Sequence, residues 1–306
     1  MQVFGAVLNQ MLVLFVFMAA GFFLNKKQLL PKDDSVVLSK LETYILVPCL
    51  VFNTFYKYCT VENFRAKWEY LAYGVGFVAV SVPVGFLLAY IFAKNGYARK
   101  IYNYSFAVAN FSFMGNAVVL GVFGEEVLFD YMMFTLPLTL YVYSYGTASL
   151  KPDESCRFSF KMFLNPICIS MLLGATLGLI ALPLPKFLTG AVAMGGAAMS
   201  PLAMLLTGFV IGDYSLKTLA KQKKVYYASL IRLIALPAVI LTVIKLCGVP
   251  DDIVRVTLCA AAMPLGLNTV VFPAAYGGDT TLGAAMAFIS HLLSIITIPI
   301  MAAIFL

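Results

Sequence analysis

The chain has 306 residues, of which 62% are hydrophobic and 11% are charged. Soluble globular domains carry about a quarter charged residues, so a soluble core of this length is excluded. The net charge of +7 would suit a nucleic-acid partner. However, the basic residues lie in short segments between apolar runs, which is typical of the cytoplasmic side of a membrane protein. We therefore expect an integral membrane protein that contacts lipid and no nucleic acid.

Ten apolar runs predict ten transmembrane helices, because each span needs roughly 20 apolar residues. The first run continues to Leu24 with no basic segment before it, so we expect a retained helix and not a cleaved signal peptide. In chain order the expected spans are 3–24, 36–56, 69–93, 102–123, 126–148, 162–182, 187–211, 225–247, 253–276 and 281–305.

The lysines and arginines predict the orientation of these spans. Loops on one side receive fourteen of them and loops on the other side receive six. The richer side faces the cytoplasm, so both termini are expected outside.

A polar linker in the middle of the chain suggests an internal duplication. We expect residues 1–148 to form a first five-helix repeat, 149–161 a cytoplasmic linker and 162–306 a second five-helix repeat. An odd number of spans per half gives the halves opposite orientations, an inverted repeat that is typical of secondary transporters. Prolines recur at matching places, Pro48 with Pro201 and Pro83 with Pro237.

The fourth and ninth spans carry Gly, Asn and Pro near mid-membrane. Gly and Pro weaken helices, and Pro264 also lacks a backbone N–H, so we expect both helices to be broken there and to cross. Their new N-termini would expose N–H groups and partial positive charge, which together favour an anion. The candidate substrate-binding residues are Asn110, Ser112, Gly115 and Asn116 in the fourth span and Pro264, Gly266, Asn268 and Thr269 in the ninth.

Asn116 and Asn268 are predicted at N-cap positions, where their side chains would satisfy the backbone or reach a ligand. The alternative interpretation of these segments is that Gly and Asn only allow close packing of helices.

These segments resemble the auxin efflux carrier family, whose bacterial members include malate or malonate permeases. The resemblance covers nearly the whole chain and is carried by the Asn116 region, Asn165-Pro166, Pro201-Leu202-Ala203, Met263 to Asn268 and Tyr276 to Asp279. It implies a five-plus-five inverted repeat, a crossover of the fourth and ninth helices and elevator-like transport of organic anions. The fold implied is similar to that of bile-acid/sodium symporters.

The same resemblance implies a scaffold made of the first, second, sixth and seventh spans, through which a homodimer would form, and a bacterial inner-membrane location. Asn116 and Asn268 match the crossover asparagines of the family. The plant carriers have Pro after each asparagine, whereas Ala117 and Thr269 follow here, so auxin itself is not implied as the substrate.

Ionisable residues inside spans are costly and are candidates for function. His291, the only histidine, is a candidate for proton coupling, or a neutral core side chain bonded to a hydroxyl or carbonyl. Arg232, the second candidate for coupling, is expected to extend to the headgroups, or else to bind substrate or an ion-pair partner. Glu42 and Asp130 are expected to form structural pairs, and Glu125, Glu126 and Asp279 to cap helices.

No cofactor or metal site is expected, and the coupling ion is H+ or Na+. The six cysteines form no CxxC motif and are expected to be small buried side chains. Three tyrosines at the end of the fifth span, Tyr141, Tyr143 and Tyr145, are expected to anchor it at the interface.

An enzyme is not expected. Gly277-Gly278-Asp279 faintly resembles an aspartyl protease motif without a second intramembrane Asp, and Ser290 and His291 are neighbours that face different directions on a helix. There is no Walker-type loop and no repeated polar ring of the kind that lines channels. The remaining alternatives to an organic-anion permease are a cation- or proton-coupled exchanger of related fold and a membrane sensor.

Overall fold

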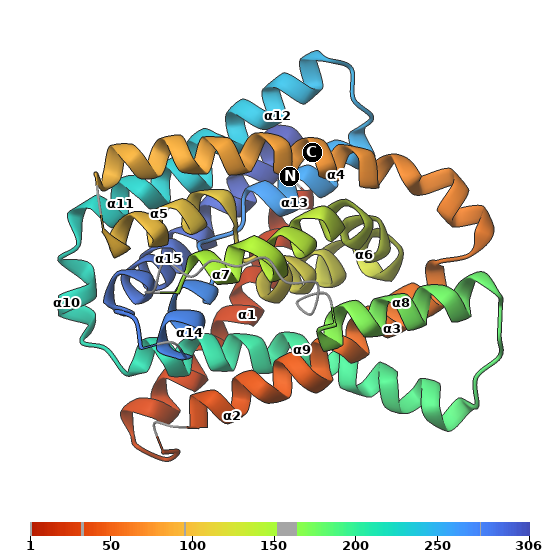
Figure 1. Ribbon diagram of the computed structural model, residues 1–306, viewed down its shortest axis with the longest axis horizontal. Coiled ribbons are helices and arrows are strands. Elements are labelled where there is room, and N and C mark those ends of the chain that lie inside the picture. The colour runs from red at the N-terminus through yellow and green to blue at the C-terminus, as the bar shows by residue number, and fades with distance from the viewer. Residues whose placement is uncertain (1, 32–33, 95, 152–163, 276) are drawn as a thin grey trace.

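The computed structural model describes residues 2–31, 34–94, 96–151, 164–275 and 277–306 (Figure 1). Over these residues the regular structure is helical. Six helices are long and apolar enough to cross a membrane: Gln2–Lys26, Asp34–Tyr58, Val61–Phe92, Lys186–Gly212, Lys223–Leu246 and Thr281–Phe305. The prediction of an all-helical, multi-pass membrane protein is therefore confirmed, and these six helices match six of the expected spans.

The other four expected spans are divided or shorter in the structure. The fourth consists of α5 (Tyr97–Ala107), a π turn η2 (Phe111–Gly115) and the start of α6 (Asn116–Tyr141). The fifth follows within α6 after a turn at Gly124, where φ is +87°, and ends with η3 (Val142–Gly146) and α7 (Thr147–Ser149). The sixth is the 14-residue α8 (Pro166–Leu179), and the ninth is divided into α13 (Asp251–Ala261) and α14 (Asn268–Ala275). Residues 152–163, which include most of the expected linker and the start of the second repeat, lie outside the described part.

Two of the continuous spans contain a π turn that is followed closely by proline. The second span runs through α2 (Asp34–Leu41), η1 (Glu42–Leu46) and α3 (Val47–Tyr58), with Pro48 at the start of α3. The eighth runs through α11 (Lys223–Leu230), η5 (Ile231–Ala235) and α12 (Leu236–Leu246), with Pro237 at the start of α12. Proline cannot donate to the helical ladder, and π turns often lie at functional sites. Here each π turn carries a buried ionisable residue, Glu42 in η1 and Arg232 in η5.

One group of helices packs through close backbone contacts. α1 (Gln2–Lys26) lies along α9 (Lys186–Gly212), α3 lies along α8, and α9 also packs against α3 (Figure 1). A Cβ on Gly208 of α9 would come within 1.7 Å of the Met18 oxygen, and one on Gly174 of α8 within 2.7 Å of the Phe52 oxygen. Glycines at such contacts let helix backbones approach closely, as in other membrane helix pairs.

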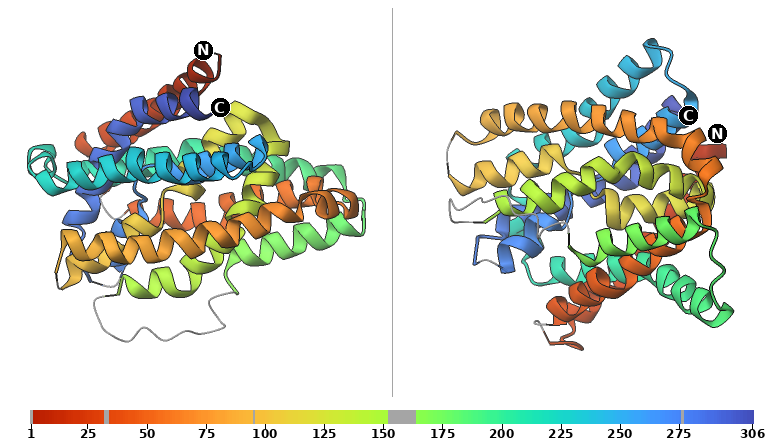
Figure 2. Two further views of the ribbon diagram at one scale, coloured as in Figure 1. Left: turned by 90° about the horizontal axis from the view of Figure 1, so that it is seen from above. Right: turned by 45° about the vertical axis from the view of Figure 1, so that its right-hand side comes forward.

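A second group surrounds the divided spans. α4 (Val61–Phe92) packs along α5 and α6, while α15 (Thr281–Phe305) contacts α1, α11, α13 and α14. The large side chains buried between these helices include Tyr104, Phe106, Tyr131 and Phe134. The second group therefore holds the divided spans in a packed, aromatic interior. The chain termini lie close together on the outside of the helices (Figure 2).

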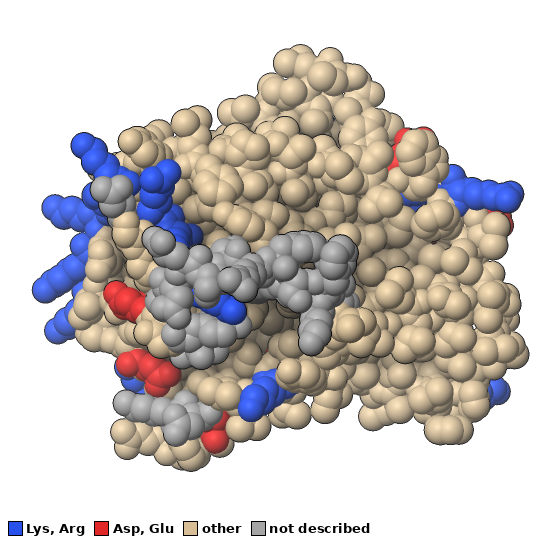
Figure 3. Space-filling view, in the orientation of Figure 1, with Lys and Arg blue, Asp and Glu red and all other residues tan. Residues whose placement is uncertain are grey.

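The outer surface is apolar between two charged ends. Large side chains such as Leu87, Phe187 and Ile304 are more than half exposed, and in a membrane they would contact lipid. Figure 3 shows lysine and arginine gathered at one end, which α10 (Leu216–Ala220) and α11 occupy in Figure 1. The short segment there contributes Lys217, Lys221, Lys223 and Lys224.

The prediction for the cysteines is wrong in one place. Cys59, Cys168 and Cys259 are buried, Cys49 is half-buried and Cys247 is exposed. Cys247 follows the last residue of α12, at the turn toward α13, so no neighbouring helix covers it. Cys156 lies outside the described residues.

Candidate functional site

The interruptions in the fourth and ninth spans lie against each other. α5 ends at Ala107, and Val108 takes extended backbone angles (φ −124°, ψ 119°). α13 ends at Ala261 and α14 begins at Asn268. Between these ends, Ala109 and Leu265 form an antiparallel bridge. Asn110 N donates to the Pro264 oxygen at 2.7 Å, so each non-helical segment satisfies part of the other's backbone, as burial in a membrane requires.

Neighbouring helices satisfy more of this backbone. The Leu265 N–H donates to Ser290 Oγ of α15 at 3.0 Å, and Tyr131 Oη of α6 donates to the Phe111 oxygen at 2.9 Å. Gly115 allows this second contact, because a Cβ there would lie 2.2 Å from the Tyr131 hydroxyl oxygen. The two segments are thus held by specific bonds from both sides.

The N-cap predictions for Asn116 and Asn268 need correction. The second half of the fourth span begins one turn earlier than expected, with Asn110 at the N-cap of η2. Asn116 has helical angles (φ −58°, ψ −40°) and lies inside the helix. Asn268 is the first residue of α14, and its Nδ2 donates across to Tyr104 Oη of α5 at 2.7 Å instead of capping α14. The hydrogen bond of Asn268 therefore depends on a partner in another helix, which sequence spacing does not reveal.

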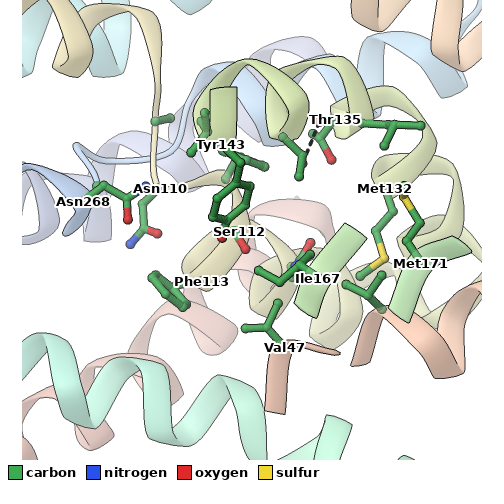
Figure 4. Close-up of a pocket in the computed structure, with 18 of the residues that line it drawn as sticks. Val47, Asn110, Ser112, Phe113, Met132, Thr135, Tyr143, Ile167, Met171 and Asn268 are labelled. Carbon is green, nitrogen blue, oxygen red and sulfur yellow. Dashed lines mark hydrogen bonds between the residues drawn. The ribbon is translucent and has the colours of Figure 1, made fainter. Parts of the chain in front are cut away.

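A cavity lies beside the meeting point, and we call it the central cavity (Figure 4). Its volume is about 60 Å³, several times the roughly 10–15 Å³ that one water needs by the same measure. Five of the eight predicted substrate-binding residues line it: Asn110, Ser112, Asn116, Gly266 and Asn268. The rest of the lining is Val47, Val51, Phe55, Ala109, Phe111, Phe113, Met132, Thr135, Leu136, Thr139, Val142, Tyr143, Ile167 and Met171.

The other three predicted residues support these segments from outside the lining. Gly115 packs on Tyr131, and the Pro264 carbonyl accepts from Asn110. Thr269 is fully buried and donates through Oγ1 to the Gly266 oxygen at 3.1 Å.

The lining of the cavity is mostly apolar, with a cluster of uncharged polar side chains. None of the described residues that line it carries a formal charge, and its polar atoms belong to amides, hydroxyls and backbone. Sequence reasoning missed Thr135, Thr139 and Tyr143 on the fifth span. Tyr143 was expected only as an interfacial anchor, yet it lines the cavity (Figure 4). The spacing Thr135, Thr139, Tyr143 places all three on one helical face, and this spacing was the available signal.

His291 lies behind the cavity. It is fully buried in α15, with Nε2 3.2 Å from Asn110 Nδ2 and Nδ1 2.7 Å from the Ala287 oxygen. The structure therefore places the candidate coupling residue in contact with a lining residue.

Arg232 does not line the central cavity. Its side chain was expected to extend to the headgroups, but it does not. It is 3% exposed, and its guanidinium donates to the oxygen of Ala261, the last residue of α13. The last carbonyls of α13 have no partner within the helix and carry partial negative charge, so they attract a cation. This attraction explains why the Arg232 side chain stays in the protein interior.

The carboxylates divide into paired and unpaired groups. Asp130 pairs with Lys67 at 2.8 Å, as predicted. Glu125 and Glu126 form ion pairs with Lys57 and Lys67, whereas Asp279 Oδ1 accepts from the Thr281 N–H as a cap would. Glu42 was expected to be paired, but it is fully buried and neither of its carboxylate oxygens has a hydrogen-bond partner among the described residues. Within the described part of the chain, no cluster of three or more His, Cys, Asp or Glu could hold a metal ion.

Comparison with known proteins identifies a family of transport proteins. A family model described as membrane transport protein matches residues 6–155 and again 154–302. An uncharacterised transporter of Methanocaldococcus jannaschii is 25% identical over 95% of this chain and 96% of its own length. An uncharacterised transporter of Methanothermobacter thermautotrophicus is 23% identical over 98% of both chains. The chain therefore belongs to the membrane transport protein family, the family of the auxin efflux carriers that its motifs resemble.

Proposed function

We propose that this protein is a secondary transporter of a small organic anion, such as a mono- or dicarboxylate, which binds in the central cavity. The observation that carries the proposal is the meeting of two interrupted helices, through the bond from Asn110 to Pro264, beside a mostly apolar cavity whose described polar lining residues are uncharged. Such a site suits a solute that must bind and leave without breaking a fixed ion pair.

Two helix N-termini supply the attraction for an anion. η2 begins after Asn110 and continues into α6, while α14 begins at Asn268, and both asparagines line the cavity. The first N–H groups of a helix have no acceptor within the helix and carry partial positive charge. A carboxylate placed between these ends would be stabilised without a buried lysine or arginine. The small volume favours a solute of a few heavy atoms.

The proposal includes ten spans arranged as an inverted five-plus-five repeat with crossed fourth and ninth helices. The division remains 1–148, 149–161 and 162–306, and the two successive family matches support it. The packing of α1 with α9 and of α3 with α8 also supports it. In such a repeat the first span (α1) corresponds to the sixth (α8), and the second (α3) corresponds to the seventh (α9). The pair α1 with α9 therefore corresponds to the pair α8 with α3. These four helices would form the scaffold of an elevator, and a homodimer would form through them.

The proposed orientation places the lysine-rich end in the cytoplasm and both termini outside, in the inner membrane of a bacterium. The gathering of Lys217, Lys221, Lys223 and Lys224 at one end supports it (Figure 3). Because membership of a transport family favours movement of a solute over its chemical conversion, we propose no enzymatic activity.

Uptake into proteoliposomes tests the function. Acetate, pyruvate, malonate, malate and succinate would be offered with imposed proton or sodium gradients. We expect at least one carboxylate to be accumulated. Asn116→Ala and Asn268→Ala should abolish that uptake, because both amides line the cavity. Asn53→Ala is the matched control, since Asn53 is buried in α3 but does not line the cavity. Full uptake by both cavity variants would contradict the proposed site.

A further inference from the structure

His291 has two hydrogen-bond neighbours whose chemistry differs. Nδ1 lies 2.7 Å from the backbone oxygen of Ala287, which can only accept a hydrogen bond. Nδ1 therefore carries a proton. Nε2 lies 3.2 Å from the amide nitrogen of Asn110, which can only donate. Nε2 therefore accepts, and the two bonds together define a neutral imidazole with its proton on Nδ1.

The bond between Asn110 and Nε2 of His291 determines which end of the Asn110 carboxamide faces the cavity. Because Nδ2 donates to His291, the carboxamide must direct Oδ1 to the other side. Figure 4 shows the Asn110 oxygen on the side of Ser112 and its nitrogen on the opposite side. Asn268 is held similarly, since its Nδ2 donates to Tyr104. With His291 neutral, the asparagine beside it presents an acceptor to the cavity, which disfavours an anion at that point.

A proton on Nε2 would reverse this arrangement. Nε2–H and the amide N–H groups of Asn110 would then be two donors facing each other at 3.2 Å. Rotation of the carboxamide by half a turn removes the conflict, because Oδ1 then accepts from Nε2–H and Nδ2 turns toward the cavity. In this state Asn110 presents donors to the cavity, beside an imidazolium, and an anion is favoured.

Among the described residues, the elements packed against α15 place no carboxylate beside His291 that would take the place of a bound anion. The elements packed against α15 contribute the buried titratable groups Tyr102, Tyr104, Arg232 and Cys259. The guanidinium of Arg232 is directed to the Ala261 oxygen. The remaining charged residues of these helices are Lys26 in α1, Arg99 and Lys100 in α5, Lys186 in α9, Lys217 in α10, Lys223 and Lys224 in α11, and Asp251, Asp252 and Arg255 in α13. A bound anion would be the negative partner of the imidazolium, separated from it by the Asn110 amide.

We propose that His291 is a positioning residue whose protonation rotates the Asn110 carboxamide from acceptor to donor and so couples proton binding to anion binding. The inference rests on the proposed substrate site and adds the coupling ion, a proton. Coupling is reciprocal, so a bound anion also favours the proton on His291. Proton and anion would then bind and be released together.

The tautomer can be measured without any substrate, because His291 is the only histidine in the chain. Protein labelled with ¹⁵N-histidine in lipid would give one pair of ring nitrogen signals by NMR. At alkaline pH we expect a protonated Nδ1 and an unprotonated Nε2, the less common tautomer of free histidine. Asn110→Leu should shift the Nε2 signal, because it removes the donor. Ser294→Ala is the control, since it alters α15 only at a bond to the His291 carbonyl. A proton on Nε2 at alkaline pH, or an Nε2 signal unchanged in Asn110→Leu, would overturn the inference.

Transport supplies the second arm. His291→Gln mimics the neutral tautomer, because its amide can donate to Ala287 and accept from Asn110, but it cannot take up a proton. Pyruvate stays ionised between about pH 8 and about pH 4, a range that extends below the one in which an exposed histidine titrates, because His291 is fully buried. We expect wild-type pyruvate uptake from an equal starting gradient to rise on the order of ten-fold over this range, a usual size for coupling between sites. Uptake by His291→Gln should stay flat.

A full pH response in His291→Gln would overturn the proton role. Absence of carboxylate uptake by the wild-type protein at every pH would instead count against the proposed function, and the NMR result would still decide the inference.

Discussion

Tyr104 connects the fourth span to the ninth, because its hydroxyl accepts a 2.7 Å hydrogen bond from Asn268 Nδ2. Tyr131 and Ser290 similarly bond the non-helical backbone at Phe111 and Leu265. At the scale of single residues, the polar groups near the central cavity are thus held by partners that come from other helices.

Removing the hydroxyl of Tyr104 should therefore weaken substrate binding without unfolding the protein. Tyr104→Phe leaves the Asn268 amide with an unpaired donor, which typically costs about 1–3 kcal/mol. We expect KM for the transported carboxylate to rise on the order of ten-fold or more. Tyr102→Phe is the matched control, since Tyr102 is buried in the same helix but is not the tyrosine that accepts from Asn268. Equal KM values for the two variants would exclude this role of Tyr104.

Arg232 is expected to contribute stability. Arg232→Met removes the donor to the Ala261 oxygen and leaves the end of α13 with an unsatisfied buried carbonyl. We expect a loss of about 1–3 kcal/mol, seen as a lower Tm in detergent. Lys245→Met changes an exposed residue of α12 and should leave the unfolding free energy within about 0.5 kcal/mol. A Tm for Arg232→Met equal to that of Lys245→Met would show that the bond to Ala261 does not stabilise the fold.

The sequence could predict which residues are unusual but not their partners. Gly, Pro and Asn in apolar runs indicated the segments around Asn110 and Asn268, because these residue types interrupt helices by themselves. The burial of Glu42 and Arg232 and the contact of Tyr143 with the cavity depend on which helices pack together. A single sequence does not specify that packing, so these residues were misplaced.

Among the elements, the six long apolar helices were predictable because a membrane span needs an uninterrupted apolar run. The π turns η1, η2, η3 and η5 were not predicted. A π turn adds one residue to a helical turn, and hydrophobic periodicity over a short run is too coarse to register that residue. The short α8 also differs from its expected span, since helical structure is described only from Pro166 onward.

Close packing of α1 on α9 can be tested through glycines. Gly208→Ala would place a Cβ 1.7 Å from the Met18 oxygen, so the two helices must separate. Overpacking of this kind typically costs about 1–3 kcal/mol. We expect a lower Tm and a smaller fraction of protein in the monodisperse peak of size-exclusion chromatography.

Gly190→Ala is the matched control for this substitution. Gly190 lies in the same helix, and a Cβ there would meet no atom within 4 Å. An equal Tm for Gly208→Ala and Gly190→Ala would contradict the close contact between α1 and α9.

For the whole molecule, the orientation rests on the unequal distribution of lysine between its two ends. The exposed Cys247 provides a native probe, because it lies at the end of α12 that is opposite the lysine-rich end. In a variant whose other five cysteines are serine, a membrane-impermeant maleimide should label Cys247 on intact cells. In the same background with Cys247→Ser, a cysteine at Gln222 should react only after the membrane is opened. The reverse pattern would place both termini in the cytoplasm.

The proposed function depends most on a carboxylate occupying the cavity where the two interrupted spans meet. Its most direct test is maleimide labelling of Ser112→Cys, a lining position, in the presence of each small carboxylate, with labelling of Cys247 as the reference. We expect the carboxylate that is transported to slow the reaction at position 112 and to leave the reaction at Cys247 unchanged. A transported carboxylate that protects neither position would show that the solute binds elsewhere.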